Sequence, residues 1–319
     1  MERHPIRTLD DLELRLPGSV VTVGVFDGLH LGHQAILDRL RAAGQRRQLP
    51  TVCVTFSVHP RAVLQGKGPE QILSLEHRLE LLEARGVDHA VVVEFGEDFA
   101  TVEAEAFVEE LLVRRLGVAE LVVGHDTAVG RGRRGDADFL GKAGTRYGFA
   151  VVALGEVRVD GQIVSSTAVR DAITSGDLVH ARRLLGRPVS LLGTVVHGDG
   201  RGSGIGFPTA NVEVNSEAFP PLGVYAVTAR CRHGDLPAVM NYGLRPTFHQ
   251  AETHAVFEVH VLDRTELELY DERMEVLLHE GLRREQRFAD VGALTAQIRK
   301  DIEAARAVHA RLPQAPPAD

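Results

Sequence analysis

Apolar residues follow two different spacings in the first half of the chain. Short continuous apolar runs are typical of strands buried on both faces, and such strands are predicted at residues 19–26, 51–56, 89–95, 120–125 and 149–157. Segments with helical spacing of their apolar positions lie between them, at residues 32–44, 74–86 and 104–117. Strands that alternate with helices predict a parallel sheet covered by helices on both faces. The first half is therefore expected to form a doubly wound α/β domain.

The pattern changes near residue 186. After a helical stretch at residues 166–186, short strands with Gly and Pro turns are predicted at residues 191–198, 223–231, 236–243, 254–263 and 274–282. Because helical spacing is absent between these runs, they favour an antiparallel β-barrel. We expect one domain at residues 1–186 and a second at residues 187–312.

The end of the chain predicts one more helix, within residues 290–312. Asp290 would cap its start, and one helical face carries Val291, Leu294, Ile298, Ile302 and Ala305. The last residues, 313–319 (PQAPPAD), are expected to form a disordered tail.

Composition and charge narrow the class of protein. The chain has 319 residues, which exceeds the usual size of one hydrophobic core, and its 44% hydrophobic and 25% charged residues are typical of globular domains. A formal net charge of -8 argues against a nucleic-acid partner. There is no run of eighteen apolar residues and no apolar targeting segment at the start, and the two cysteines, Cys53 and Cys231, lie far apart. We expect a cytoplasmic protein with reduced thiols and no membrane association.

The string GVFDGLHLGH (residues 24–33) lies between the first predicted strand and the first predicted helix. Ligands of open α/β sheets bind at the carboxyl ends of strands, where a helix start offers unpaired N–H groups to an anion. If the helix begins near Leu31, His30 and His33 project the same way, toward a phosphate. Without further context, a glycine-rich turn with two surface histidines explains the string about equally well.

A second string, VSSTAVRDAI (residues 164–173), opens a later helix. Its hydroxyl groups, on Ser165, Ser166 and Thr167, would cap the helix or donate to a phosphate, and Arg170 lies one turn further on. Plain helix capping is the alternative interpretation.

Together, the two strings resemble the HxGH nucleotidyltransferase superfamily, and the first has the GxFDGxHxGH form of bacterial FAD synthetases. The resemblance implies a Rossmann-like domain in which His30, His33 and Arg170 neutralise phosphate charge during adenylyl transfer, without a covalent enzyme intermediate. The residues it implies for ATP binding are Gly24, Phe26, Asp27, Gly32, Ser166 and Thr167.

Two further strings, TFSVHPRAVL with His59 and VVGHDTAVGRGRRGDADFL with Asp126, resemble the segments of this family that border flavin and nucleotide. The chain departs from the family pattern at Val58, Thr127, Val129 and Ala168. Loss of two aromatic rings, at residues 127 and 129, would weaken contact with an isoalloxazine ring or repack the loop. The arginines of the GRGRRGD segment would form either a mobile phosphate clamp or a solvated basic turn.

The barrel half opens with a glycine-rich segment, residues 193–206, which leads into GFPTAN. Such loops are common, but GFPTAN resembles the signature of riboflavin kinases. The resemblance implies that Thr209 and Asn211 are ligands of ATP-bound Mg²⁺, whose preferred ligands are oxygen atoms. It assigns ATP binding to Gly204, Gly206, Phe207 and Pro208.

Glu258 lies between Phe257 and Val259 in a predicted strand, so its side chain projects on the opposite face from theirs. A surface glutamate is one interpretation. The resemblance to the kinases implies a general base for the 5′-hydroxyl of riboflavin. Arg283 and Phe288 would border the flavin, although core packing or a surface salt bridge would also explain them.

Resemblance to the bifunctional riboflavin kinase/FAD synthetases runs from about Gly18 to Arg311. It implies that riboflavin is phosphorylated to FMN, that FMN is adenylylated to FAD, and that both steps use ATP with Mg²⁺. Two alternatives remain: a riboflavin kinase with a weak or inactive adenylyltransferase domain, and a non-catalytic flavin sensor. The expected partners are the substrates ATP, riboflavin and FMN, and the chain is expected to be a monomer or a weak homo-oligomer.

Overall fold

The computed structural model describes residues 1–198, 204, 206–246, 253–264 and 267–312. The chain divides into two compact units, Met1–Ala168 and Val169–Asp319, which are considered separately. The predicted domain boundary after Gly186 follows the change in sequence pattern and stays a prediction. The predicted disordered tail, residues 313–319, lies outside the described residues.

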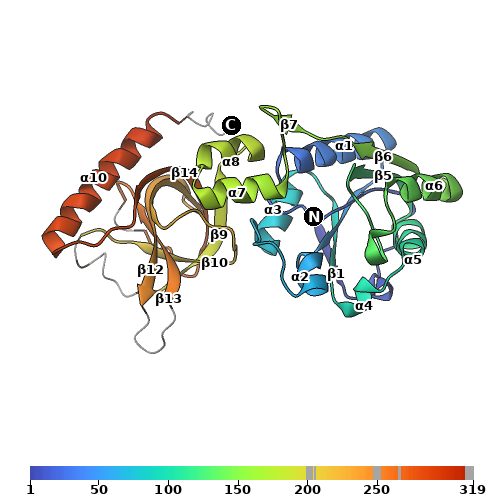
Figure 1. The fold of residues 1–319 in the computed structure, drawn as a ribbon, viewed down its shortest axis with the longest axis horizontal. Coiled ribbons are helices and arrows are strands. Elements are labelled where there is room, and N and C mark those ends of the chain that lie inside the picture. Colours follow the sequence, from blue (N-terminus) through green and yellow to red (C-terminus); the bar gives the residue numbers. More distant parts are fainter. Residues whose placement is uncertain (199–203, 205, 247–252, 265–266, 313–319) are drawn as a thin grey trace. The chain divides into compact units, whose positions relative to one another are not determined.

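The first unit is built on a six-stranded parallel sheet, as predicted (Figure 1). Its strands are β1 (Glu2–Ile6), β2 (Ser19–Val23), β3 (Thr51–Phe56), β4 (His89–Val93), β5 (Val118–Gly124) and β6 (Ala150–Leu154). They lie in the order β1-β4-β3-β2-β5-β6, and every neighbouring pair is parallel. The chain moves from β2 toward one edge and later returns to β5 on its other side. The carboxyl end of β2 is therefore the topological switch point, where ligands of open α/β sheets bind.

Helices connect the strands of this sheet. They are α1 (Leu31–Arg47), α2 (Pro60–Gln65), α3 (Leu75–Ala84), α4 (Glu97–Ala100), α5 (Ala104–Ala106) with its π-helical continuation η2 (Phe107–Arg115), and α6 (Ala137–Tyr147). Short 3₁₀ turns, η1 (Leu9–Asp11) and η3 (Arg131–Arg133), and a small hairpin of β7 (Arg158–Val159) and β8 (Gln162–Ile163) complete the unit. α1 packs against β2, β3 and β5, and α6 packs against β6. A continuous core lies on the sheet and includes Val21, Val54, Val91, Phe107, Leu111 and Val123.

Three features of this unit differ from the sequence prediction. The first predicted strand ends at Val23 rather than residue 26, because the backbone turns and Phe26 adopts a positive φ of 56°. The strand β1 was not predicted, since Ile6 is its one buried residue. The helix α6 was also missed, because its segment carries two glycines and few large apolar residues.

The second unit contains a closed six-stranded barrel, as predicted. Its strands are β9 (Val189–Val196), β10 (Ala210–Val214), β11 (Gly223–Cys231), β12 (Gly234–Pro246), β13 (Thr253–Val261) and β14 (Arg273–Arg284). They close in the order β10-β13-β12-β11-β14-β9, and every neighbouring pair is antiparallel. The strand β10 was not predicted, because it is short and only Val212 among its residues is buried.

Among the described residues of this part of the chain, three helices accompany the barrel. The stretch predicted as helical at residues 166–186 forms two helices, α7 (Ser166–Ser175) and α8 (Leu178–Leu185), because Gly176 has a φ of 86° and Asp177 caps a new helix. α8 packs against β9 and β14, and α7 spans the division between the units.

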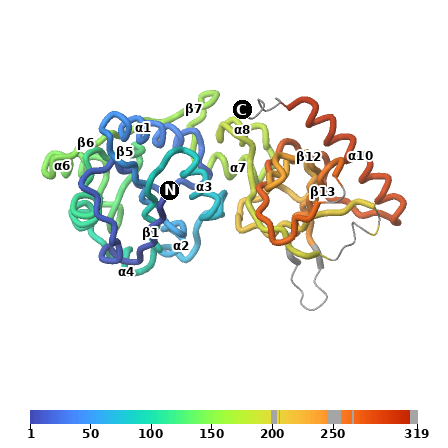
Figure 2. The backbone as a smooth tube through the Cα atoms, turned by 180° about the vertical axis from the view of Figure 1, so that it is seen from behind, coloured from blue at the N-terminus to red at the C-terminus, as the bar shows by residue number. Residues whose placement is uncertain are grey.

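The terminal helix α10 (Val291–His309) begins as predicted, with the Asp290 carboxylate accepting a hydrogen bond from the Ala293 amide. It packs on the outside of the barrel against β11, β12 and β14 (Figures 1 and 2). The predicted apolar face is partly wrong: Ala305 and Val308 are buried, whereas Val291 is 61% exposed. None of the described helices is both long enough and apolar enough to cross a membrane.

Candidate functional site

The loop between β2 and α1 has an unusual backbone. Three of its residues have positive φ angles: Phe26 at 56°, Gly28 at 82° and Leu29 at 44°. Phe26 and Leu29 are nevertheless almost fully buried, at 1% and 2% exposure. Non-glycine residues persist in this region only where the surrounding structure enforces it, and such positions cluster at functional sites.

Buried polar side chains hold this loop in place. The Asp27 carboxylate accepts hydrogen bonds from the amides of Ile72 and Leu73, at 3.0 and 3.1 Å. The buried Arg78 guanidinium donates to the carbonyl oxygens of Val25, at 2.7 Å, and Phe56, at 2.5 Å. The loop is therefore fixed to the end of β3 and to the segment before α3.

His30 and His33 lie together where α1 begins, as the sequence predicted. His30 is the N-cap of α1, and its Nδ1 accepts a hydrogen bond from the His33 amide at 3.3 Å. Since Nδ1 accepts, the proton of a neutral His30 ring is on Nε2, which is then the nitrogen able to donate to an anion. The His30 ring stacks on that of His33, with centroids 3.7 Å apart.

Both histidines are held in the neutral state. Burial lowers the pKa of His30 to about 4, against an opposing effect of the Asp126 carboxylate. Burial, and then the charges of His30 and Arg78, lower the pKa of His33 well below its ordinary value. The pair therefore presents neutral rings, which can act on an anion through N–H donation together with the amides at the start of α1.

A glycine is required next to this pair. A Cβ atom at Gly32 would lie 3.1 Å from Cε1 and 3.2 Å from Nδ1 of His30, so a side chain there would displace the ring. A Cβ atom at Gly24 would lie 3.1 Å from the Phe26 ring.

The second predicted string joins the same loop. The Ser166 hydroxyl donates to the Asp27 carbonyl oxygen at 2.8 Å, and Ser165 Oγ caps α7 by accepting from the Ala168 amide at 3.2 Å. Thr167 is exposed. Arg170 lies on α7 within the second unit, one helical turn after Ser166.

A pocket of about 340 Å³ lies beside these residues in the first unit, lined by His125, Asp126, Thr127, Ala128, Arg133, Asp136, Ala137 and Asp138. The Asp126 charge acts on His30, which ties the pocket to the histidine pair. Arg133 donates to the Asp126 carbonyl oxygen at 2.7 Å. Of the two residues predicted to border flavin in this unit, Asp126 lines the pocket. His59 caps α2, since its Nδ1 accepts a hydrogen bond from the Arg61 amide.

The departures from the family pattern have different surroundings. Val129 is 6% exposed and packs in the core of the first unit, while Val58 is 37% exposed. Thr127 lines the pocket. Loss of the aromatic ring at position 129 thus changes core packing, and loss of the ring at position 127 changes the pocket wall.

In the barrel, three polar side chains lie side by side on adjacent strands. Glu258 of β13 is paired in register with Asn211 of β10 on one side and with Asn241 of β12 on the other. Asn241 Nδ2 donates to Glu258 Oε2 at 3.2 Å. Their common face is opposite to the buried Phe257 and Val259, as the alternation in the sequence predicted.

The side-chain oxygen of Asn211, Oδ1, is buried without a hydrogen bond from any described residue. Buried oxygens of this kind are rare, and a ligand or metal ion often explains them. Mg²⁺ prefers oxygen ligands, so Asn211 fits the predicted magnesium site, and the part of Thr209 in that site stays a prediction. Thr209 lines a pocket of about 100 Å³ together with Val259 and Val261, whose side chains project on the opposite face of β13 from Glu258.

The predicted ATP-binding segment is fixed to β13 through His260. His260 Nδ1 lies 2.7 Å from the Pro208 carbonyl oxygen, and the Phe207 ring centroid lies 5.9 Å from that of His260. Gly206 has a φ of 86°, and both Gly204 and Gly206 are exposed. The rest of the predicted glycine loop, residues 199–203 and 205, lies outside the described part of the chain.

Arg283 has a structural partner in this unit. Its Nε lies 3.0 Å from each Asp301 oxygen and its Nη2 lies 2.9 Å from Oδ2, which joins β14 to α10. Its guanidinium also lies 5.5 Å from the Phe288 ring centroid. Arg283 therefore forms a salt bridge, although a largely buried one and not the surface pair named from the sequence, and a flavin role for Arg283 and Phe288 stays a prediction.

The sequence did not predict the contacts of two residues in these sites, Arg78 and Asn241. Arg78 sits in an ordinary amphipathic helix, and no local signal indicates that its side chain reaches the loop before α1. Asn241 lies in the string MNYGLRPTF, which resembles the kinase family, so its position was available although its contact with Glu258 was not.

The fold and the two sites define a class of two-domain transferases, with an HxGH nucleotidyltransferase domain followed by a flavokinase-type barrel. Comparison with known proteins agrees: the family model described as FAD synthetase matches residues 13–168, and the one described as riboflavin kinase matches residues 185–309. The chain belongs to the bifunctional riboflavin kinase/FMN adenylyltransferase family.

Two curated relatives bear that family's name. The protein from Pseudomonas fluorescens is 41% identical over 305 residues, covering 96% of this chain and 97% of the relative. The protein from Escherichia coli K12 is 41% identical over 291 residues, covering 91% of this chain and 92% of the relative. Among solved structures, one from Streptococcus pneumoniae, reported as a macrolide-efflux protein, has a TM-score of 0.83 at 29% identity and covers 96% of this chain and 99% of its own.

Proposed function

We propose that this chain converts riboflavin to FAD in two successive transfers, one in each unit. The barrel transfers the γ-phosphate of ATP to riboflavin and yields FMN and ADP. The α/β unit transfers the adenylyl group of a second ATP to FMN and yields FAD and pyrophosphate. The observation that carries the proposal is that each unit gathers its predicted reactive groups, His30 with His33 and Glu258 with Asn211.

In the adenylyl transfer, a phosphate oxygen of FMN attacks the α-phosphorus of ATP and the bond to pyrophosphate breaks. No side chain needs to act as a nucleophile, so catalysis consists of positioning and charge stabilisation. His30 Nε2–H, His33 and the first amides of α1 donate to the phosphates, and Arg170 supplies positive charge. Because the rings are neutral in the free protein, their pKa values would rise only when the anionic substrate arrives.

In the phosphoryl transfer, the riboflavin 5′-oxygen attacks the γ-phosphorus and ADP leaves. Glu258 accepts the hydroxyl proton, and the hydrogen bond from Asn241 orients its carboxylate for this role. Asn211 and Thr209 would hold Mg²⁺, which neutralises the charge of the ATP phosphates when bound. Gly204, Gly206, Phe207 and Pro208 would bind ATP through the segment fixed by His260.

The flavin of the first unit is proposed to enter the 340 Å³ pocket next to Asp126. This volume falls in the range of about 300–1,000 Å³ that small-molecule sites occupy. Thr127 gives that pocket a small polar wall, which predicts weaker flavin affinity than an aromatic residue would give. His59 is proposed as a further flavin contact of the first unit, and Arg283 and Phe288 are proposed as flavin contacts of the barrel.

One assay tests the proposal. Purified protein is incubated with riboflavin, ATP and Mg²⁺, and the flavins are separated chromatographically over time. FMN is expected first and FAD afterwards. Accumulation of FMN without FAD would leave only the kinase activity, and no conversion would favour the sensor alternative.

The variant Glu258→Gln separates the two sites. It should lower FMN formation by about 10²- to 10⁴-fold, the usual contribution of a general base, while FAD formation from supplied FMN continues. The matched control is Glu213→Gln, the same change at an exposed position of the neighbouring strand β10. Loss of both activities in Glu258→Gln would contradict separate sites.

We also propose where the protein acts, its oligomeric state, its partners and its domain boundary. We place its action in the cytoplasm, as a monomer or weak homo-oligomer with small-molecule partners and no nucleic acid. We place the functional boundary between the adenylyltransferase and kinase domains after Gly186. Light scattering during size-exclusion chromatography measures the oligomeric state.

A further inference from the structure

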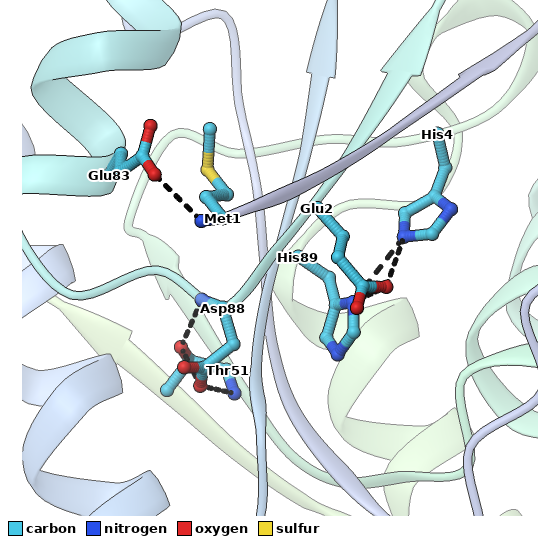
Figure 3. A network of polar contacts seen from close by, with 7 residues as sticks. All are labelled: Met1, Glu2, His4, Thr51, Glu83, Asp88 and His89. Atoms are coloured by element: carbon cyan, nitrogen blue, oxygen red, sulfur yellow. Dashed lines mark hydrogen bonds and ion pairs between the residues drawn. The ribbon is translucent and has the colours of Figure 1, made fainter.

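A cluster of three side chains lies at the edge of the parallel sheet, away from both sites described above. Glu2 and His4 belong to the edge strand β1, and His89 is the first residue of β4 (Figure 3). Glu2 is paired in register with His89, and His4 lies two residues further along β1, so the three side chains share one face of the sheet. The cluster is at the amino ends of these strands, whereas the histidine pair of α1 follows the carboxyl end of β2.

The ligand atoms of this cluster form a nearly equilateral triangle. His4 Nε2 lies 3.3 Å from His89 Nδ1, His89 Nδ1 lies 3.4 Å from Glu2 Oε2, and His4 Nε2 lies 3.8 Å from the same oxygen. Hydrogen bonds to nitrogen are usually about 2.7–3.2 Å long, so hydrogen bonding alone accounts poorly for these spacings. A tetrahedral zinc site with bonds of about 2.0–2.1 Å places its ligand atoms roughly 3.3–3.4 Å apart.

The chemistry of the three groups matches the same interpretation. Metal ions bind imidazole nitrogens, and each of the two histidines offers one ring nitrogen to the cluster. Two imidazoles and one carboxylate are a ligand set that suits zinc and similar divalent transition metals. The histidine side chains are 22% and 15% exposed and the glutamate is 71% exposed, so an ion would reach the cluster from solvent.

The backbone around the cluster is fixed without a metal ion. The Met1 ammonium group pairs with Glu83 at 2.8 Å, and the Glu2 amide donates to the Asp88 carbonyl oxygen at 2.9 Å. Asp88 and Thr51 exchange hydrogen bonds at 2.8 and 3.0 Å, which fixes the residue that precedes His89 (Figure 3). The backbone that carries the three ligands is thus held in place before an ion binds.

We propose that Glu2, His4 and His89 form a binding site for Zn²⁺ or a chemically similar divalent transition-metal ion. Three protein ligands leave the fourth tetrahedral position to water. Because two ligands come from β1 and one from β4, the bound ion fastens the edge strand to the sheet. Its role is structural and independent of the two transfer reactions.

The test uses the full chain starting at Met1, purified without a polyhistidine tag. Calorimetric titration with Zn²⁺ in excess Mg²⁺ should show one saturable equivalent. Mutation of a residue that only hydrogen-bonds to a metal ligand usually lowers metal affinity by about 10- to 100-fold. Loss of a direct ligand in His4→Ala or His89→Ala should therefore weaken Zn²⁺ binding by more than about tenfold. His233→Ala, a change at an exposed histidine of the barrel unit, is the matched control and should bind as the wild type does.

Two further measurements keep the proposal falsifiable if an alanine variant folds poorly. Glu2→Gln preserves shape and should also weaken Zn²⁺ binding, and Co²⁺ should give the visible absorption bands of a tetrahedral site in the wild type but not in His4→Ala or His89→Ala. Zn²⁺ should slow hydrogen exchange of the β1 amides. Absence of a saturable equivalent, or equal Zn²⁺ affinity in the wild type and both histidine variants, would overturn the proposal.

Discussion

The imidazole rings of His30 and His33 stack with their centroids 3.7 Å apart and an angle of 17° between their planes. Two positive charges at this spacing would repel strongly in a buried site, so the stack is compatible with neutral rings. The same arrangement places both rings at the start of α1, where an anion is stabilised by the helix amides. If the stack binds a phosphate as proposed, its rings carry no charge before the phosphate arrives.

The first prediction concerns the contribution of His33 to adenylyl transfer. Replacement by alanine should lower the rate of FAD formation from FMN by about 10²- to 10³-fold, which is the usual cost of losing one preorganised donor to a developing charge. FMN formation from riboflavin should be unchanged, since it occurs in the barrel. Chromatography of flavins from separate incubations with FMN and with riboflavin measures both rates. A parallel fall of the two rates would point to misfolding instead.

The second prediction concerns the pH dependence of stability. The pKa of His30 is about 4 in the folded protein, compared with 6.5 for the ordinary side chain, so between these values the unfolded chain binds the extra proton. Stability contributed by the neutral ring is complete above pH 6.5 and is lost as the pH falls toward 4, by at most about 3.5 kcal/mol at about 1.4 kcal/mol per unit.

The variant His30→Asn isolates this effect. Asparagine is a good N-cap, so it can keep the cap of α1 without a titrating group. Denaturant unfolding at several pH values should show a smaller loss of stability in the variant than in the wild type between pH 6.5 and 4, after both are normalised at neutral pH. Equal pH profiles would mean that His30 is not held neutral by the fold.

The sequence predicted most of the sheet because its strands carry their own signal. Val21, Val54 and Val91 are fully buried, and each belongs to a continuous apolar run that can be recognised in the sequence without knowing which strands lie beside it. The edge strand β1 lacks that signal, since its polar residues face solvent or His89 and only Ile6 is buried. Its existence depends on pairing with a strand more than eighty residues away, which no local pattern contains.

The sites show the same division between local and distant causes. The shared direction of His30 and His33 follows from a helix that begins at Leu31, so spacing alone predicts it. The role of Arg78 depends on the carbonyl oxygens of Val25 and Phe56, which only the folded chain brings to its guanidinium. Likewise, the Asp301 partner of Arg283 is set by the docking of α10 on the barrel.

The third prediction concerns that ion pair. Asp301 is 5% exposed and also accepts a hydrogen bond from Gln297 at 2.8 Å. Asp301→Asn leaves the Arg283 charge without its partner and should lower the free energy of unfolding of the barrel unit by about 3 kcal/mol. Asp263→Asn is the control: it breaks an exposed pair with Arg306 on the same helix and should change stability little. Thermal unfolding of the three proteins compares them, and a similar effect of both changes would contradict a structural role of the Arg283–Asp301 pair.

The fourth prediction concerns Gly198, which lies against the Asn211 side chain. A Cβ atom there would lie 1.9 Å from Asn211 Nδ2 and 2.6 Å from Cγ, so Gly198→Ala must displace the amide whose Oδ1 is proposed to face Mg²⁺. A displacement of about 1 Å can cost about 10²-fold in rate, and FMN formation should fall by that order while FAD formation from FMN continues. Gly141→Ala, on α6 of the other unit, is the matched control because nothing lies within 4 Å of its added Cβ.

Raising the Mg²⁺ concentration should partly restore FMN formation in Gly198→Ala if the amide oxygen acts through the metal ion. Unchanged kinase activity in Gly198→Ala would show that the position of Asn211 is not needed for phosphoryl transfer.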